Sequence, residues 1–536
     1  MVSRTGGGAR GASPAITMVA VLLTLLILPT SVTGSGVALP HIGRDTDASL
    51  DLLQWVVHAY NLTFASFMLA CGSLADLLGR RRVFATGAVV FTAASLVSAV
   101  STDIYVLDVS RAIAGVGAAA LLTSGSSILA TTFKGATRNR VFAAVGIVTG
   151  GGLALGAMIA GILADTLGWR SFYGVHAALM ALVLIAIPFM GESRSETASK
   201  VDWAGTVTFV GSLFLLMLGV VEGPQWGWSS PGVLGLLVGA ALLMAVFVVV
   251  ERRHPHPMFD LALLRNGPFM ALCLIPVVVT FSFVILLPLL PNYLVVANGD
   301  SSQAAGTTML LMTLPILVTP LVAGRLVRQG WTPRAVFALS LACLTLGVAW
   351  LAVVLQPGIG LGALTGPLVL LGIGLGLNFG LVDGAVLNVV SPESTGTAAG
   401  FLNTLRLGSE AVVIAAAGSA LVNLTQSWFR DGLDRFPAYD GGVAELANKV
   451  NSGDLADPLA TLPTGVQPAF RDFVTEGFTD AWQAVLWASA AICCALSIAI
   501  YVMLAEPKRG TTVAGDPPAD AASAADRHEA SAQSLT

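Results

Sequence analysis

Charged residues are scarce in this chain. They make up 11% of its 536 residues, against roughly 25% in an ordinary soluble domain, and the mean hydropathy is +0.81. A soluble protein of this length would lack the charge to cover its surface, so the composition excludes a soluble enzyme and a disordered chain. The net charge of −4 offers no basic surface for nucleic acid.

Motifs of covalent, metal and nucleotide chemistry are also missing. No P-loop, H-E-x-x-H or G-x-S-x-G motif occurs. The sequence therefore predicts no enzyme activity, no catalytic residue, no cofactor, no metal site and no direct use of ATP. The cysteines lack the spacing of a metal site or a disulfide framework and lie inside apolar stretches, at Cys71, Cys273, Cys343, Cys493 and Cys494.

Long apolar runs are abundant. A helix needs about 20 mostly apolar residues to cross a bilayer, and the runs are too long and too little alternating for the strands of a barrel. We therefore expect an all-α membrane protein. The fourteen predicted transmembrane helices are 14–39, 53–75, 83–101, 104–131, 140–164, 172–190, 203–222, 231–250, 268–296, 304–324, 335–355, 361–390, 399–424 and 481–504.

Lysine and arginine gather on one side of these spans, as is typical of cytoplasmic loops. With the N-terminus inside, 19 of the 27 basic residues fall at cytoplasmic ends and loops, so both termini are expected in the cytoplasm. The predicted organisation is a disordered head (1–13), an N-terminal six-helix bundle (14–191), two linker helices (192–266), a C-terminal six-helix bundle (267–505) with a long extracytoplasmic loop (425–480), and a disordered tail (506–536).

The most specific local motif joins the second and third spans. It reads Gly72-x-Leu74-Ala75-Asp76-x-x-Gly79-Arg80-Arg81-Arg82. Glycine permits tight turns, a carboxylate can accept hydrogen bonds from a neighbouring helix N-terminus, and arginines can anchor a loop at an anionic membrane surface. A weaker copy at 324–334 has Arg328 in place of the acid, which indicates that the two bundles are repeats.

This motif resembles G-x-L-a-D-r-x-G-r-[RK] of the major facilitator superfamily. The resemblance implies two six-helix bundles that rock about a central site. It also implies that the loop is a latch stabilising the outward-facing state. The expected latch residues are Gly72, Asp76, Gly79, Arg80 and Arg81. The alternative is that the arginines only fix the topology.

Arg111 lies within the fourth span, three residues after Asp108 and on the same helix face. An arginine in a span costs at least ~2.5 kcal/mol unless it is paired or faces water. The run from Arg111 to Ala119 resembles the superfamily pattern R-x-x-Q-G-x-G-a-A, whose arginine is linked to proton transfer, although Ala114 replaces the glutamine. The alternative is an Asp108–Arg111 pair that only neutralises itself.

Two further stretches resemble the fourteen-helix drug:proton antiporters of this superfamily. Gly152, Gly156 and Gly161 resemble an antiporter glycine pattern and are expected to form a helix-packing pivot, with a plain packed helix as the alternative. Residues 30–40 resemble the family's first-helix signature L-D-x-T-x-x-N-V-A-L-P. Ser31 stands where that family has aspartate, so the usual first-helix acid cannot carry protons here.

The remaining charged residues inside spans are candidates for proton coupling. Together with Asp108 and Arg111 they are Asp383, Arg406 and Glu410. Asp383 has no partner on its own helix, which favours it as the proton carrier, whereas Arg406 and Glu410 are four residues apart and can pair. His58 and His176 can titrate near neutrality or serve only in packing.

The resemblance and these residues predict proton-driven export of an amphipathic small molecule, such as an antibiotic, across a bacterial plasma membrane. We expect the substrate to bind between the halves, with Asn292, Asn378 and Asn388 as polar contacts. Its partners are then protons and lipid, with neither nucleic acid nor ATP. Proton-coupled uptake or metabolite transport by the same fold is an alternative. A second class is a non-transporting membrane sensor whose loop 425–480 recognises a ligand, rather than serving as a solvated connector.

Overall fold

The computed structural model describes residues 13–192, 201–255, 257–391 and 394–505. These ranges contain helices and no strand, and thirteen of the helices are long and apolar enough to cross a membrane, or fourteen if a bent pair within α5 counts as one span. The prediction of an all-α membrane protein is confirmed. Most of the predicted head and the whole predicted tail lie outside the described residues.

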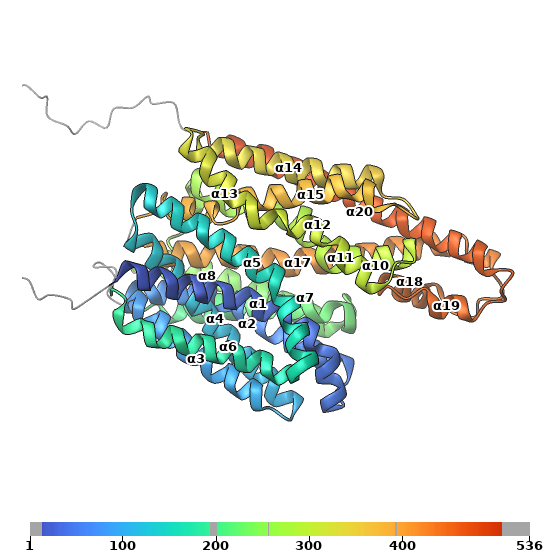
Figure 1. Cartoon of the computed structure of the whole chain (residues 1–536), viewed down its shortest axis with the longest axis horizontal. Coiled ribbons are helices and arrows are strands. Elements are labelled where there is room, and N and C mark those ends of the chain that lie inside the picture. The colour runs from blue at the N-terminus through green and yellow to red at the C-terminus, as the bar shows by residue number, and fades with distance from the viewer. Residues whose placement is uncertain (1–12, 193–200, 256, 392–393, 506–536) are drawn as a thin grey trace, which may run out of the picture.

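Six long helices form the N-terminal half (Figure 1). Helix α4 is capped by Asp103, which accepts hydrogen bonds from the amides of the first turn. Adjacent helices are separated at Gly79 and Gly168, whose φ angles of +106° and +82° suit only glycine. The elements are α1 (Pro14–Thr46), α2 (Leu50–Leu78), α3 (Arg80–Val100), α4 (Ile104–Thr132), α5 (Gly135–Leu167), α6 (Trp169–Ala186) and the short helix η1 (Ile187–Phe189).

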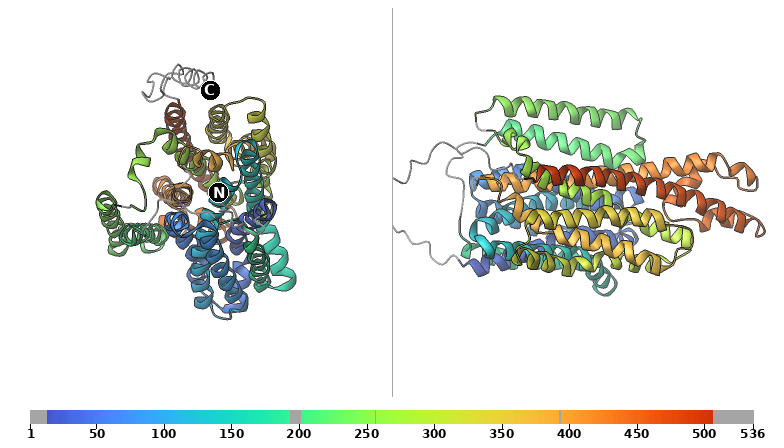
Figure 2. Two further views of the ribbon diagram at one scale, coloured as in Figure 1. Left: turned by 90° about the vertical axis from the view of Figure 1, so that its left-hand side faces the viewer. Right: turned by 90° about the horizontal axis from the view of Figure 1, so that it is seen from above.

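A hairpin of two helices follows, α7 (Trp203–Trp226) and α8 (Pro231–Arg253), with the short helix η2 (Leu261–Arg265) after it. Asp202 caps α7 and Ser230 caps α8. Figure 2 shows the hairpin at one side of the bundle. Helix α7 packs on both α2 and α17 (Thr395–Arg430), which belong to different halves.

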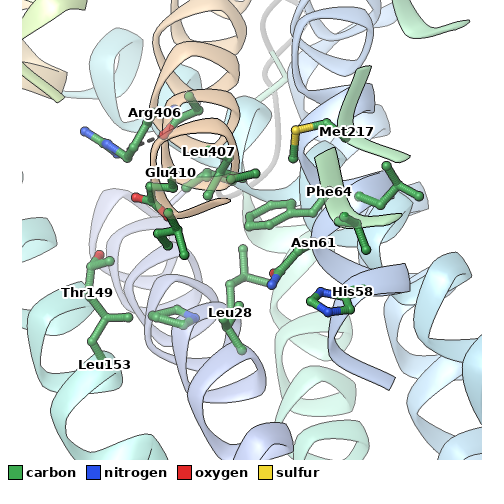
Figure 3. A pocket seen from close by; sticks show the side chains of 18 of the residues that line it. Leu28, His58, Asn61, Phe64, Thr149, Leu153, Met217, Arg406, Leu407 and Glu410 are labelled. Carbon is green, nitrogen blue, oxygen red and sulfur yellow. Dashed lines mark hydrogen bonds between the residues drawn. The ribbon is translucent and has the colours of Figure 1, made fainter. Parts of the chain in front are cut away.

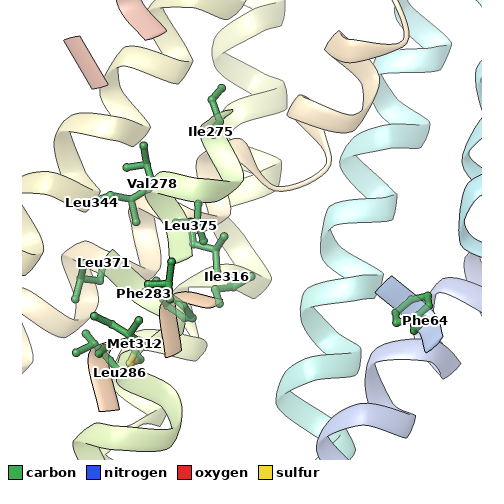
Figure 4. Packing of buried hydrophobic residues seen from close by; sticks show 14 of the residues in the cluster. Phe64, Ile275, Val278, Phe283, Leu286, Met312, Ile316, Leu344, Leu371 and Leu375 are labelled. Atoms are coloured by element: carbon green, nitrogen blue, oxygen red, sulfur yellow. The ribbon is translucent and has the colours of Figure 1, made fainter. Parts of the chain in front are cut away.

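The C-terminal half differs from the sequence prediction because three predicted spans are interrupted. The span 268–296 changes register at a π-helical turn, 304–324 is divided near Met309 and Leu314, and 361–390 breaks at Gly380, whose φ is +78°. The elements are α9 (Gly267–Val279), η3 (Thr280–Val284), α10 (Leu286–Asn298), α11 (Ser302–Thr308), α12 (Leu310–Thr313), α13 (Pro315–Arg328), α14 (Pro333–Val354), α15 (Leu361–Asn378), α16 (Leu381–Val386), α17 and α20 (Gln467–Met503). Apolar side chains from several of these helices fill the half (Figure 4).

The stretch predicted as the loop 425–480 is largely helical. Helices α17 and α20 run into it from both sides, and between them lie η5 (Leu433–Arg435), α18 (Val443–Asn451) and α19 (Ala456–Ala460). Residues 431–466, here called the lobe, have an apolar core that includes the buried Leu446 and Val450. Asn292 Nδ2 donates to the Asn451 carbonyl at 3.0 Å and ties the lobe to α10. The lobe is therefore a packed structure, because buried apolar side chains hold it.

The two halves meet at the end of the molecule where α1 begins and α20 ends (the terminal end), which is opposite the lobe end (Figure 1). There α2 and α17 cross so closely that a Cβ at Gly72 would overlap the Gly396 carbonyl. On the other side of the interface a Cβ at Gly380 would overlap the Phe142 carbonyl of α5. Backbones can approach this closely only where side chains are absent.

We expect Gly400→Val to destabilise the protein by about 1–3 kcal/mol. The added Cβ would lie 2.7 Å from the Met68 carbonyl oxygen and 2.8 Å from Leu69 Cα. Gly408→Val is the matched control on the same helix, because a Cβ there meets nothing within 4 Å. Thermal unfolding of the two purified variants in detergent measures the difference. Equal unfolding midpoints would contradict the close contact between α2 and α17.

Candidate functional site

A cavity of about 700 Å³ lies between the two halves. Its walls come from α1, α2, α4 and α5 of the first half, from α7, and from α16, α17 and the α15–α16 break of the second half. Most of its lining is apolar, and the charged side chains lie on α16 and α17. A mostly apolar cavity with a few convergent polar groups is typical of a small-molecule binding site.

An ion pair lies in the wall formed by the second half. Arg406 of α17 donates from Nη2 to Asp383 Oδ2 at 3.2 Å and from Nη1 to Asn403 Oδ1 at 2.8 Å. Asp383 reaches the cavity because the chain breaks at Gly380 and restarts as α16, with Asp383 in its first turn. The sequence placed Asp383 and Arg406 on different spans but did not indicate that they meet.

Glu410 is one turn beyond Arg406 and also lines the cavity (Figure 3). Arg406 binds Asp383, so the expected alternative of a self-satisfied Arg406–Glu410 pair is wrong. Within the described ranges no hydrogen bond or ion pair reaches the Glu410 carboxylate. Figure 3 shows His58 and Asn61 of α2 across the cavity from it. The free carboxylate therefore lies where a proton or a positively charged ligand group could bind.

Arg111 is fully buried, with 1% of its surface exposed. Its guanidinium donates to Ser31 Oγ at 3.0 Å and to the Val56 carbonyl at 3.1 Å, and it lies 4.2 Å from the centre of the Tyr60 ring. The expected Asp108–Arg111 pair is not found among the described residues, and Asp108 Oδ1 is buried without a partner there. The arginine is instead held by α1 and α2, because hydroxyl, carbonyl and aromatic groups can share its charge.

His176 is a packed residue with both ring nitrogens bonded. Nδ1 lies 2.7 Å from the Phe172 carbonyl and Nε2 lies 2.9 Å from Thr30 Oγ1. His58, in contrast, lines the cavity and has an edge contact with Trp55. Of the two histidines, only His58 is placed where a substrate could reach it.

Asp76 joins the two halves at the terminal end. It accepts hydrogen bonds from the Gly396 amide at 3.0 Å and from the Thr397 amide at 2.9 Å, both in the first turn of α17. Arg80 donates to the same carboxylate at 2.9 Å. The carboxylate thus occupies the positive end of the α17 dipole and bridges to its own half.

The three arginines of this motif do not share one role. Arg80 is 3% exposed, so it does not face lipid headgroups as the sequence suggested. The Arg81 amide donates to Glu192 Oε1 at 3.1 Å, and the Arg82 Nε lies 3.9 Å from Glu192 Oε2. Glu192 lies against the turn at Gly79, whose φ is +106°, because a Cβ there would be 2.8 Å from Glu192 Oε1.

The three glycines expected as a pivot lie on α5, where it packs against α1. A Cβ at Gly152 would come within 2.7 Å of the Leu26 carbonyl oxygen, and one at Gly156 within 2.7 Å of Thr30 Cα. Gly161 has room for an ordinary contact with Val37, at 3.6 Å. The first two therefore permit a close helix crossing, and the third does not need to be glycine on steric grounds.

The three asparagines expected as polar contacts are not in the cavity lining. Asn292 binds the lobe, Asn378 donates to Ser340 Oγ at 2.9 Å, and Asn388 is exposed. Besides His58, the uncharged polar side chains that do line the cavity are Gln54, Asn61, Ser126, Thr149, Gln225 and Asn403. The sequence carries no signal that separates them from other polar residues in spans, because their selection depends on how the helices are rotated.

Several curated proteins resemble this chain over most of its length. It is 31% identical over 433 residues to the multidrug resistance protein Stp of Mycobacterium tuberculosis, with 78% of each chain covered. It is 27% identical over 509 residues to the tetracenomycin C resistance and export protein of Streptomyces glaucescens, with 93% of each covered. The puromycin resistance protein of Streptomyces alboniger is 30% identical over 436 residues, covering 80% of this chain and 86% of the relative.

Solved structures share the fold. A bacterial homologue of the iron transporter ferroportin in its outward-facing state matches with a TM-score of 0.58 at 12% identity, covering 91% of this chain and 99% of that one. The human organic anion transporter MFSD10 matches with a TM-score of 0.56 at 15% identity, covering 89% and 98%. The family model described as Major Facilitator Superfamily matches residues 21–413. This chain is therefore no enzyme but a multi-pass membrane protein that belongs to the Major Facilitator Superfamily.

Proposed function

We propose that this protein exports an amphipathic small molecule, an antibiotic or other drug, across a bacterial plasma membrane in exchange for protons. The observation that carries this proposal is the cavity between the halves, whose apolar lining surrounds an ion pair and an unpartnered carboxylate. An amphipathic molecule needs both kinds of surface. Relatives named for multidrug resistance and for tetracenomycin C export support the direction of transport.

The contacts between the halves support alternating access. At the terminal end, Asp76 and the close crossing of α2 and α17 hold the halves together. The cavity lining extends from Asp383 and Arg406 toward Gln54 and Gln225, near the lobe end. With both termini in the cytoplasm, this arrangement corresponds to a state that is closed on the cytoplasmic side. Release of the Asp76 contact would let the halves rock and expose the cavity to the other side.

Protons are proposed to enter through the carboxylates of the cavity. Glu410 has no partner among the described residues, so a proton and a cationic substrate group would compete for it. Asp383 is bound to Arg406, so its protonation would release the guanidinium. Asp108 and Arg111 lie outside the lining of this cavity and are proposed to respond to coupling rather than to touch substrate.

Inverted membrane vesicles distinguish export from the alternatives. With an imposed proton gradient, an exporter accumulates ethidium or puromycin, and an uncoupler abolishes the accumulation. Uptake by the same fold would give accumulation in right-side-out vesicles instead. A sensor would move neither probe in either orientation, which would contradict the proposal.

Glu410→Gln and Asp383→Asn are expected to differ. Glu410→Gln removes a titratable group without breaking a bond, so gradient-driven ethidium transport should fall at least ~10-fold while the unfolding temperature is retained. Asp383→Asn also breaks the ion pair with Arg406, so it should lower stability by about 1–3 kcal/mol as well. Glu445→Gln, on the lobe, is the control and should change neither. Full driven transport by Glu410→Gln would exclude Glu410 as the carrier.

Asp76→Asn should reduce transport by about 10-fold at a normal protein level in the membrane. The asparagine side chain carries no charge, and its NH2 group would face one of the two α17 backbone N–H groups that donate to Asp76. Roughly 1.5–3 kcal/mol of the stabilisation from this contact is therefore lost. Asp103→Asn is the control, because its carboxylate caps only its own helix and asparagine caps equally well. A drop in membrane level in place of a drop in transport would assign Asp76 to folding alone.

A further inference from the structure

Helix α7 forms part of the cavity wall, although it belongs to neither six-helix half. Five of its residues line the cavity: Met217, Val220, Val221, Pro224 and Gln225. Figure 3 shows Met217 on the far side of the cavity from Thr149 and Leu153 of α5. The linker hairpin is therefore more than a connection between the halves.

Helix α7 packs where it contacts both α2 and α17. At the terminal end these helices touch directly, with Gly400 against Met68. Farther along, Met217 packs in an apolar cluster with Leu62 of α2, and Leu407 of α17 lies against the same cluster. Met217 is 3% exposed. Its side chain thus packs against residues of both α2 and α17.

The end of α7 and the turn that follows it are bonded to both halves. Gln225 Nε2 donates to Gln54 Oε1 of α2 at 3.0 Å, and Trp228 Nε1 donates to Ser419 Oγ of α17 at 2.8 Å. The Trp228 ring lies over Gly223, where a Cβ would be 2.7 Å from the ring. Two side-chain bonds, one to each half, fix α7 across the seam.

Helix α8 packs on the outer face of α7, and α7 alone of the two lines the cavity. In the most apolar 18-residue stretch of α8, only 17% is buried inside the protein, and Leu242 and Val238 are exposed. None of the cavity-lining residues belongs to α8. The layers from lipid to cavity are therefore α8, then α7, then the space where a ligand would lie.

The cavity is chemically polarised by this arrangement. Its ion pair and its free carboxylate lie on α16 and α17, whereas the α7 wall offers a thioether, two valines, a proline and one amide. An amphipathic ligand gains most when its charged group faces Glu410 and its apolar part faces Met217. Methionine is suited to apolar groups of varied shape, because its side chain is unbranched and polarisable.

We propose that α7 is the substrate-selecting wall of the cavity, where Met217 and Gln225 determine which apolar groups are accepted. The proposal rests on the proposed export function and adds a determinant outside the two repeated bundles. It also assigns α7 the task of separating a bound ligand from lipid along the seam between α2 and α17.

Met217→Ala and Gln225→Ala test the proposal, with Leu215→Ala as the matched control. Leu215 is on α7 but faces α8, where a Cβ at Gly239 would lie 3.1 Å from it. The readout is the ratio of KM values for ethidium and puromycin in inverted vesicles. A changed pocket volume should change this ratio by about tenfold for Met217→Ala, and Leu215→Ala should leave it unchanged. Met217→Leu restores the volume and should restore the ratio.

The outcomes distinguish a failure of the selecting role of α7 from a failure of the proposed export function. If the unaltered protein transports neither probe, the export function fails before α7 is tested. If it transports both, and all three alanine variants keep its KM ratio, the selecting role of α7 is overturned. A common fall in turnover with an unchanged ratio would likewise reduce α7 to a structural linker. A changed ratio in Met217→Ala and Gln225→Ala alone supports the proposal.

Discussion

Lipid offers no hydrogen-bond partner, and this constraint governs where the polar groups inside the described spans lie. Backbone groups are satisfied within helices, and most of the few charged side chains inside the spans are bonded or face the cavity, although Asp108 Oδ1 is buried without a partner in the described chain. Arg111 shows the first solution, with a hydroxyl, a carbonyl and an aromatic ring around its guanidinium. Glu410 shows the second, because its carboxylate faces the cavity and binds nothing else in the described chain.

Composition and hydropathy were sufficient to predict the fold class, because crossing a membrane leaves few alternatives. They could not predict the interruptions in the second half. The break at Gly380 lies within a run of apolar residues, and glycine is common in spanning helices, so its left-handed conformation has no distinct sequence signal. That break is nevertheless what brings Asp383 to Arg406. Pairing between distant helices depends on their rotation, which hydropathy alone does not specify.

In the candidate site too, the sequence predicts which residues matter better than it predicts which residues they contact. The glycine-rich motif was enough to select Asp76 and to predict that its carboxylate accepts hydrogen bonds from a helix N-terminus. The motif could not show that this helix is α17. Asp108 and Arg111 were placed together by their spacing, yet the arginine turns toward Ser31 and Val56 instead. Gln225 was not among the residues that the sequence selected for the site. Its place in the cavity arises because the linker hairpin packs across the seam between the halves.

The length of α17 has a mechanical consequence. The helix begins at the Asp76 contact, passes the cavity and continues unbroken to the lobe, over 36 residues. Such a rod is roughly 54 Å long, and a tilt of about 5° around its middle would displace each tip by roughly 2 Å. A movement at the Asp76 end of α17 would thus displace the lobe end of the same helix. Any molecule that binds α17 at the lobe end would in turn oppose the tilt.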